Sequence, residues 1–257
     1  MRVFVTGASG WIGSAAVDEL LSAGHEVTGL ARSDASAAAL EAKGVRVRRG
    51  DLDDLASLRA GAEAAEAVIH LANKHDWSNP AASNAAERAA VQTIGDVLVG
   101  SDRRFLLASG VAALAQDRAA TEDDASPFHG PESPRGGSEN LALEFVDRGV
   151  QTVSLRFAPT VHGTGDHGFI AAIAAIARRK GVSGYPGDGA TNGPRSTAPM
   201  PDALLRLGSR MLRRARGCMP SPKTAFRLAT SPQRSAARST CPSPRSSLPM
   251  SKTTSGG

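Results

Sequence analysis

The chain has very few cysteines and aromatic residues. Its 257 residues include two cysteines, Cys218 and Cys241, and both lie in the last quarter. Residues 1–189 therefore have no thiol for a disulfide or for a thiolate metal site, which fits a reducing cytoplasm. One tyrosine, Tyr185, and two tryptophans provide no stacked aromatic surface for bases, so nucleic acid is not an expected partner.

Long apolar runs are also missing. No segment approaches the roughly 18 consecutive apolar residues that a membrane-spanning helix needs. The chain opens directly on Met-Arg-Val-Phe-Val-Thr, without the basic leader and apolar stretch of a signal peptide. We therefore expect a soluble, cytoplasmic protein without a membrane partner.

Acidic residues almost vanish toward the end of the chain. Residues 190–257 carry 12 lysines and arginines but a single acid, Asp202, whereas residues 1–189 carry 18 basic and 24 acidic side chains. The last part is also rich in proline and serine, and such a sequence buries little apolar surface. We predict a folded domain over residues 1–189. Residues 190–257 are then a basic tail that is either disordered or the product of a frameshift.

Segments of strand and helix character alternate through the first part of the chain. Short β-branched or apolar runs predict strands, and apolar residues at helical spacing predict helices. We expect strands at residues 3–6, 26–31, 45–49, 67–71, 105–109 and 150–157, and helices at 11–23, 34–43, 54–60, 80–99, 138–148 and 169–178. Repeated βα units predict an α/β fold of the Rossmann type, a doubly wound parallel sheet with helices on both faces.

A glycine motif stands where the first strand turns into the first helix. The sequence Thr6-Gly7-Ala8-Ser9-Gly10-Trp11-Ile12-Gly13 has the spacing Gly-x-x-Gly-x-x-Gly. Glycine lets the backbone turn tightly and approach a pyrophosphate, while the N–H groups and the dipole of the following helix attract its charge. The motif predicts a dinucleotide site made of Gly7, Ser9, Gly10, Trp11, Ile12 and Gly13. The alternative is a glycine-rich turn that binds nothing.

The end of the second expected strand bears on the choice of cofactor. Sites that select NAD usually offer a carboxylate there to the ribose 2′-hydroxyl, but this strand ends in Gly29-Leu30-Ala31-Arg32-Ser33. A guanidinium can hold a 2′-phosphate through two hydrogen bonds, so Arg32 favours NADP(H) over NAD(H). Two alternatives stay open: Arg32 is a solvated surface residue, or Asp34 selects NAD. Asp34 fits equally well as the N-cap of the next helix.

The cofactor motif and two later segments resemble those of the extended short-chain dehydrogenase/reductases, the NAD-dependent epimerase/dehydratase-like family. The later segments are Gly50-Asp51-Leu52 and His70-Leu71-Ala72-Asn73, and the resemblance continues through residues 156–163 to about residue 189. It implies that Asp51 and Leu52 flank the adenine. It also implies that Leu71, Ala72 and Asn73 line the path to the nicotinamide ribose. Asp51 fits as well as a turn cap before Asp54.

The usual catalytic pair of this family is missing. The resemblance implies a Tyr-x-x-x-Lys pair, but Arg135 falls at the tyrosine position and Glu139 at the lysine position. Arginine is a poor proton donor near neutral pH, and glutamate does not replace the positive charge of a lysine. Strict alignment puts Gly110 at the position of the catalytic serine, so Ser109 is the nearest candidate. These departures indicate an atypical member of the family.

His162, Asp166 and His167 are the other candidates for proton transfer. The segment from Val161 to Phe169 resembles an atypical bacterial and fungal subgroup, and the resemblance implies that it faces the nicotinamide. Either histidine can shuttle a proton, and Asp166 can orient an imidazole. The alternative is a polar loop in which the aspartate caps the following helix.

Two functions are compatible with these features. The first is an NADP(H)-dependent oxidoreductase or epimerase-like enzyme that acts on a small carbonyl or hydroxyl compound. The second is a cofactor-binding sensor or scaffold without turnover, which the missing tyrosine supports. No metal site is expected, since Asp51, Asp53 and Asp54 are explained by capping at a helix start. We expect a monomer or a homodimer.

The sequence of the tail suggests a change of reading frame. In the resembling subgroup a substrate lobe follows Gly-Asp-Gly, whereas here Gly187-Asp188-Gly189 is followed by the basic tail. Codons chosen for residues 217–227 and 250–256 can spell LHAVAEDGVP and EQDHFG in another frame, and both resemble that lobe. The hypothesis is a frameshift near residue 190 that leaves the C-terminal substrate lobe missing or aberrant. Sequencing the gene tests it.

Overall fold

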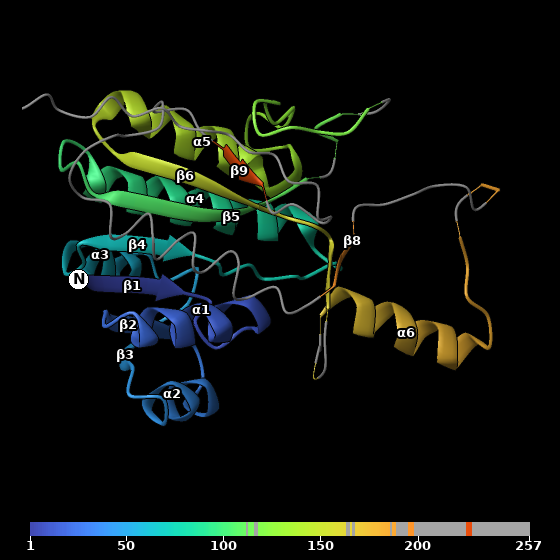
Figure 1. Cartoon of the computed structure of the whole chain (residues 1–257), viewed down its shortest axis with the longest axis horizontal. Coiled ribbons are helices and arrows are strands. Elements are labelled where there is room, and N and C mark those ends of the chain that lie inside the picture. Colours follow the sequence, from blue (N-terminus) through green and yellow to red (C-terminus); the bar gives the residue numbers. More distant parts are fainter. Residues whose placement is uncertain are drawn as a thin grey trace, which may run out of the picture.

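The computed structural model describes residues 1–111, 113–115, 118–162, 165, 168–185, 187–188, 195–197 and 225–227. Its strands are β1 (Arg2–Thr6), β2 (Glu26–Ala31), β3 (Arg46–Arg49), β4 (Ala67–His70), β5 (Arg104–Gly110), β6 (Gln151–Phe157), β7 (Thr160–His162), β8 (Arg195–Thr197) and β9 (Ala225–Arg227). Its helices are α1 (Trp11–Ser22), α2 (Asp34–Glu41), α3 (Leu55–Glu63), α4 (Pro80–Leu98), α5 (Ser138–Glu144) and α6 (Phe169–Lys180), with the 3-10 turns η1 (Pro134–Gly137) and η2 (Phe145–Arg148). Figure 1 shows this arrangement.

The main sheet is parallel and has the order β3-β2-β1-β4-β5-β6-β9. The chain runs outward from β1 to β3 and then returns to place β4 on the other side of β1. The order of the strands therefore reverses between β1 and β4, and in doubly wound sheets ligands bind beyond the carboxyl ends of the strands at such a point. The expected Rossmann-type fold is confirmed.

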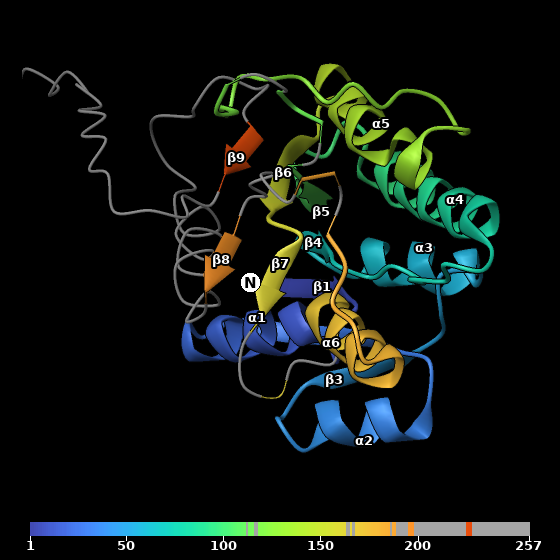
Figure 2. The same ribbon diagram turned by 90° about the vertical axis from the view of Figure 1, so that its right-hand side faces the viewer.

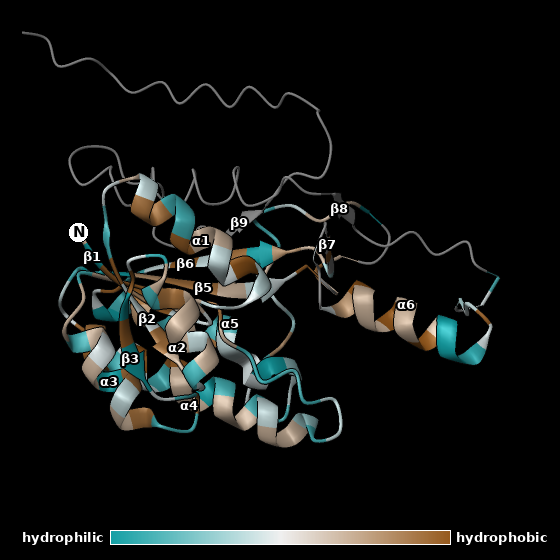
Figure 3. Ribbon diagram, turned by 90° about the horizontal axis from the view of Figure 1, so that it is seen from below, coloured by the Kyte–Doolittle hydropathy of each residue, from teal (hydrophilic) through white to brown (hydrophobic). Residues whose placement is uncertain are grey.

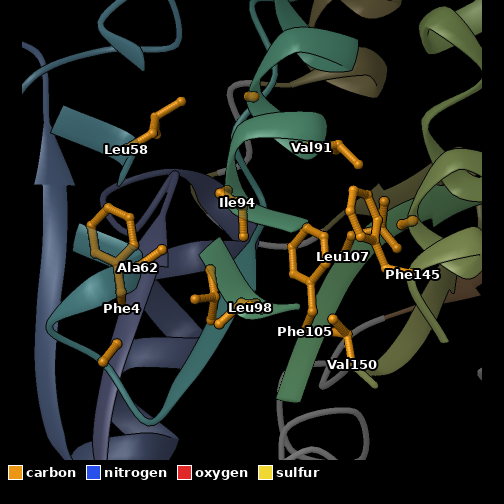
Figure 4. Packing of buried hydrophobic residues seen from close by; sticks show 14 of the residues in the cluster. Phe4, Leu58, Ala62, Val91, Ile94, Leu98, Phe105, Leu107, Phe145 and Val150 are labelled. Atoms are coloured by element: carbon orange, nitrogen blue, oxygen red, sulfur yellow. The ribbon is translucent and has the colours of Figure 1, made fainter. Parts of the chain in front are cut away.

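Alternating residues of the strands form the two cores. Val3 and Val5 belong to a cluster with residues of α1 and α2, whereas Phe4 belongs to a second cluster with residues of α3, α4 and α5. Figure 4 shows the second cluster, in which Phe105 and Phe145 pack beside α4. This alternation follows from the two-residue period of a strand and covers both faces of the sheet. The covered sheet holds the loops at its carboxyl edge in place.

The first residue of α2 corrects one sequence expectation. The N-cap is Ser33 and not Asp34: the Ser33 hydroxyl accepts the backbone N–H of Ser36 at 3.2 Å, and the Ser36 hydroxyl accepts the N–H of Ser33 at 3.1 Å. Asp34 is the first residue of α2, and its carboxylate accepts a hydrogen bond from Arg49 at 2.7 Å. Serine caps a helix about as well as aspartate does, and here the serine comes first in the chain.

The segments after β6 lie on both sides of the expected domain boundary at residue 189. α6 projects from the body on the side toward which the arrows of β1 and β5 point (Figures 1 and 3), and no residue of α6 is buried. Of residues 190–257 the structure describes the short strands β8, which pairs with β7 (Figure 2), and β9, which pairs with β6. The division at residue 189 stays a prediction. Among the described residues, no helix has the length and apolar character to cross a bilayer.

Candidate functional site

The glycine loop packs backbone against backbone between β1 and α1. Gly7 has a positive φ of 68°, and a Cβ there would lie 2.7 Å from the backbone nitrogen of Ala72. A Cβ on Gly13 would lie 1.9 Å from the carbonyl oxygen of Gly7. Only glycine fits these two positions without a shift of the backbone. The first turn of α1 therefore lies close to the carboxyl ends of β1 and β4, with N–H groups that have no acceptor inside the helix.

A buried pair ties this loop to the end of β4. The Thr6 hydroxyl lies 2.8 Å from Nδ1 of His70 and also accepts the backbone N–H of Ala72 at 3.3 Å. Both side chains are fully buried. Leu71, Ala72 and Asn73 follow directly at the carboxyl end of β4 and are partly buried. The structure thus brings Leu71 and Ala72 beside Gly7, and Asn73 is the next residue of the chain.

Two guanidinium groups lie at the neighbouring ends of β2 and β3. Arg32 is exposed, as the prediction of a phosphate contact requires. Arg49, at the end of the neighbouring strand β3, donates to Asp34 at 2.7 Å and to the carbonyl oxygen of Ser33 at 2.8 Å. We did not single out Arg49 from the sequence. The parallel register, in which Ala31 faces Arg49, is what brings it here.

Asp51 and Leu52 both make contacts within the folded chain. The Asp51 carboxylate accepts the backbone N–H groups of Asp53 at 2.8 Å and Asp54 at 3.1 Å. Asp51 therefore caps this turn, as the alternative prediction has it. Leu52 is buried in the core with α3 and α4. A contact of either residue with adenine stays a prediction.

A buried carboxylate, Glu87, lies beside the end of β4. Glu87 is fully buried on α4; its Oε2 accepts the side-chain amide of Asn73 at 3.2 Å, and its Oε1 accepts Nη2 of Arg135 at 2.5 Å. Nε2 of His70 lies 3.7 Å from Oε1, which is beyond hydrogen-bond distance. Burial raises the pKa of Glu87, but the charge of Arg135 and the neighbouring donors together have a larger effect in the opposite direction. The pKa of Glu87 is therefore lowered from 4.5 to about 2.

Ser109 lies at the carboxyl end of β5 and belongs to a second charged group. Its hydroxyl donates to Oε2 of Glu139 at 2.5 Å, and Oε1 of Glu139 accepts Nε of Arg156 at 2.7 Å. Glu139 and Arg156 are both buried. The residues at the expected tyrosine and lysine positions, Arg135 and Glu139, are thus each paired with an opposite charge inside the protein.

Some of the remaining predicted residues lie outside the part of the chain that the structure describes. The backbone of His162 forms the end of β7, while its side chain, Asp166 and His167 lie outside the described residues. Ser9 is exposed at the glycine loop, and Trp11 and Ile12 begin α1. Within the described part of the chain, no three His, Cys, Asp or Glu side chains are grouped as metal ligands.

The sequence reasoning missed Glu87, although a signal was present. It is an acid on the apolar side of α4, between the buried residues Ala86 and Ala90. An acid at such a position needs a partner inside the protein. The pattern therefore pointed to a buried ion pair, but the sequence could not name Arg135 as the partner, 48 residues further along the chain.

Comparisons with known proteins agree with this geometry. An uncharacterized protein of Schizosaccharomyces pombe, C2A9.02, is 42% identical over 190 residues, which are 74% of this chain and 64% of that protein. The 4-hydroxy-2-methyl-3-oxo-4-farnesyl-3,4-dihydroquinoline-1-oxide ketoreductase of Stigmatella aurantiaca is 28% identical over 190 residues, 70% of this chain and 56% of that protein. The chain thus spans less than two thirds of the length of either relative.

The fold and the family model point the same way. The structure of MoeE5 in complex with UDP-glucose and NAD matches with a TM-score of 0.63 and 25% identity, over 89% of this chain and 75% of that one. The model of the NAD dependent epimerase/dehydratase family matches residues 3–189. This chain therefore belongs to the NAD-dependent epimerase/dehydratase family, within the extended short-chain dehydrogenase/reductases.

Proposed function

We propose that the chain binds a nicotinamide dinucleotide at the carboxyl ends of β1 and β4 and acts as an oxidoreductase or epimerase-like enzyme. The observation that carries the proposal is the close packing of Gly7 on Ala72 and of Gly13 on Gly7, which holds the first turn of α1 at the carboxyl ends of β1 and β4, where a pyrophosphate can accept its N–H groups. MoeE5, whose fold matches, was solved with NAD. When bound, the cofactor supplies or accepts a hydride.

NADP(H) is the preferred cofactor in this proposal. Arg32 is exposed at the end of β2, where it can contact a 2′-phosphate. Asp34, the acid that could instead hold a 2′-hydroxyl, is already paired with Arg49. The two guanidinium groups outnumber the one carboxylate, so this end of the sheet favours an anion.

The affinities for NADPH and NADH test the proposal. We expect tighter binding of NADPH in a fluorescence titration, and a loss of about tenfold on Arg32→Ala, equal to about 1.4 kcal/mol, because one charged contact is removed. Binding of NADH should hardly change. The control is Arg46→Ala, which removes an exposed arginine from the other end of β3. A folded protein that binds neither nucleotide would contradict the cofactor assignment.

Ser109 and Glu139 are the proposed path for the substrate proton. The Ser109 proton is directed to Glu139, so the hydroxyl oxygen can accept a hydrogen bond from a substrate hydroxyl. During oxidation the substrate proton passes to Ser109, and the Ser109 proton passes to Glu139, while Arg156 holds the carboxylate in place. His162 and His167 remain proposed proton donors, with Asp166 as the residue that orients an imidazole.

The alternative is a cofactor-binding protein without turnover, favoured by the charge pair of Arg135 at the tyrosine position. NADPH oxidation with a panel of aldehydes, ketones and nucleotide sugars separates the two functions. If the chain is an enzyme, Ser109→Ala should lower turnover by about 10²-fold, as expected for a lost proton-transfer group. Asp166→Asn and His167→Ala test the orienting aspartate and one histidine donor. Binding of NADPH without turnover of any substrate would favour the alternative.

A further inference from the structure

We propose that Arg135 binds a carboxylate group of the substrate, so that the chain acts on a carbonyl or hydroxyl compound that is also an acid. This inference rests on the proposed function, because it concerns the substrate of the same site. Four features of the structure carry it.

The first feature is the orientation of the ion pair. Glu87 is 0% exposed, whereas the side chain of Arg135 is 34% exposed. The negative charge therefore points inward, toward Asn73 and His70, and the positive charge is the part that solvent reaches. A guanidinium has five N–H donors, and within the described part of the chain Arg135 uses one of them, toward Glu87. The open side of this pair is cationic and has donors to offer.

The second feature is the backbone conformation. Arg135 has φ 55° and ψ 24°, and Gly136 and Gly137 continue the same left-handed turn. A residue with a Cβ pays roughly 1–2 kcal/mol for this conformation, which glycine adopts freely. The turn is fixed by Asn84, whose side-chain oxygen accepts the N–H of Arg135 at 2.9 Å, and by Arg88, which donates to the carbonyl oxygen of Gly136 at 2.8 Å. Arg135 therefore occupies a position at which glycine would be less strained.

The third feature is energetic. A buried ion pair contributes little net stability compared with apolar residues of similar size, because both charges lose their hydration. Stability alone therefore does not explain why Glu87 and Arg135 occupy these positions. The pair does hold the guanidinium in one orientation, which is what recognition of a planar carboxylate through two parallel hydrogen bonds requires.

The fourth feature is location. The Glu87 carboxylate also binds Asn73, directly after Ala72, and Ala72 touches the glycine loop of the cofactor site. Glu139, the partner of Ser109, follows Arg135 by four residues. The proposal therefore places the carboxylate of the substrate at Arg135 and its reactive hydroxyl or carbonyl group at Ser109.

The test is a calorimetric titration of the full 257-residue chain with malonate and with malonamide, its neutral analogue, each with and without saturating NADPH. The key comparison is between Glu87→Gln and the double variant Glu87→Gln/Arg135→Gln, because neither leaves a fully buried carboxylate without its counter-charge. We expect millimolar binding of malonate to the original chain, weaker binding to Glu87→Gln because the guanidinium loses its orienting partner, binding to the double variant at least about tenfold weaker again, and no binding of malonamide. Arg46→Gln, which removes an exposed arginine elsewhere, should bind malonate normally.

The outcomes separate this inference from the proposed function. Equal malonate affinity in the two Glu87 variants, or equal affinity for malonamide and malonate, would overturn the role of Arg135. Tighter binding of inorganic phosphate than of malonate would overturn the assignment to a carboxylate. If the chain binds NADPH but does not bind malonate, the cofactor site stands and this inference is overturned. If the chain binds malonate but does not bind NADPH, the carboxylate contact stands and the cofactor assignment is overturned. Thermal melts followed by circular dichroism establish that each variant is folded.

Discussion

Arg135→Leu is expected to lower the free energy of unfolding by about 3–5 kcal/mol at pH 7, because it leaves the Glu87 carboxylate buried without its counter-charge. Leucine and arginine have a similar cost in the left-handed conformation, so the backbone term hardly changes. Urea denaturation measures the loss. The double variant Arg135→Leu/Glu87→Gln should recover most of it, and a double variant as unstable as Arg135→Leu would contradict this explanation.

The same pair predicts how stability depends on pH. In the original chain the pKa of Glu87 falls from 4.5 to about 2 on folding, so its contribution is complete above pH 4.5 and is lost as the pH falls toward 2. In Arg135→Leu, burial remains and raises the pKa of this carboxyl above the unfolded value. The Glu87 carboxyl then contributes to the stability of the variant only at low pH, where it is protonated. The difference in stability between the two proteins should therefore shrink when the urea series is repeated at pH 4.5.

Gly13→Ala is expected to abolish nucleotide binding at micromolar concentrations. The added methyl group would lie 1.9 Å from the carbonyl oxygen of Gly7, so α1 or the loop must move, and overpacking of this kind costs about 1–3 kcal/mol of stability. The movement displaces the N–H groups that would hold the pyrophosphate. Affinity for NADPH should fall by about 10²-fold or more, which fluorescence titration can measure.

Gly10→Ala is the matched comparison for that variant. Its added methyl group would lie 3.2 Å from the same oxygen, and Gly10 has an ordinary φ of −75°. A shift of a few tenths of an ångström relieves this contact, so the loss of affinity should be clearly smaller. Equal effects of the two substitutions would show that close packing of the first helix on the loop is not what limits binding.

The sequence predicted the fold because the signals of this fold are local. The glycine motif, the strand before it and the helix after it lie within residues 2–22, and each of the six expected strands and six expected helices is present with ends that differ by a few residues. The strands β7, β8 and β9 have three residues each, too few for a periodic pattern. Ser33 and Asp34 are both good caps, so the sequence alone could not choose between them.

The charged groups at the site were harder to predict, because they join distant residues. Ser109 and Glu139 are 30 residues apart, and Arg135 and Glu87 are 48 apart. Alignment with the family placed Arg135 and Glu139 at the catalytic positions and showed that the usual chemistry was lost. It could not show that each replacement had gained an opposite charge inside the protein, since that depends on how α4 and α5 pack.

The helix α6 has a thermodynamic consequence of its own. It has 12 residues, none of which is buried, and Phe169, Ile173 and Ile176 leave an apolar stripe in water. Helices of this length are marginal when they stand alone, since nucleation costs more than a few turns return. Formation of α6 and covering of its stripe are therefore coupled equilibria: whatever surface covers the stripe also shifts this segment from coil to helix.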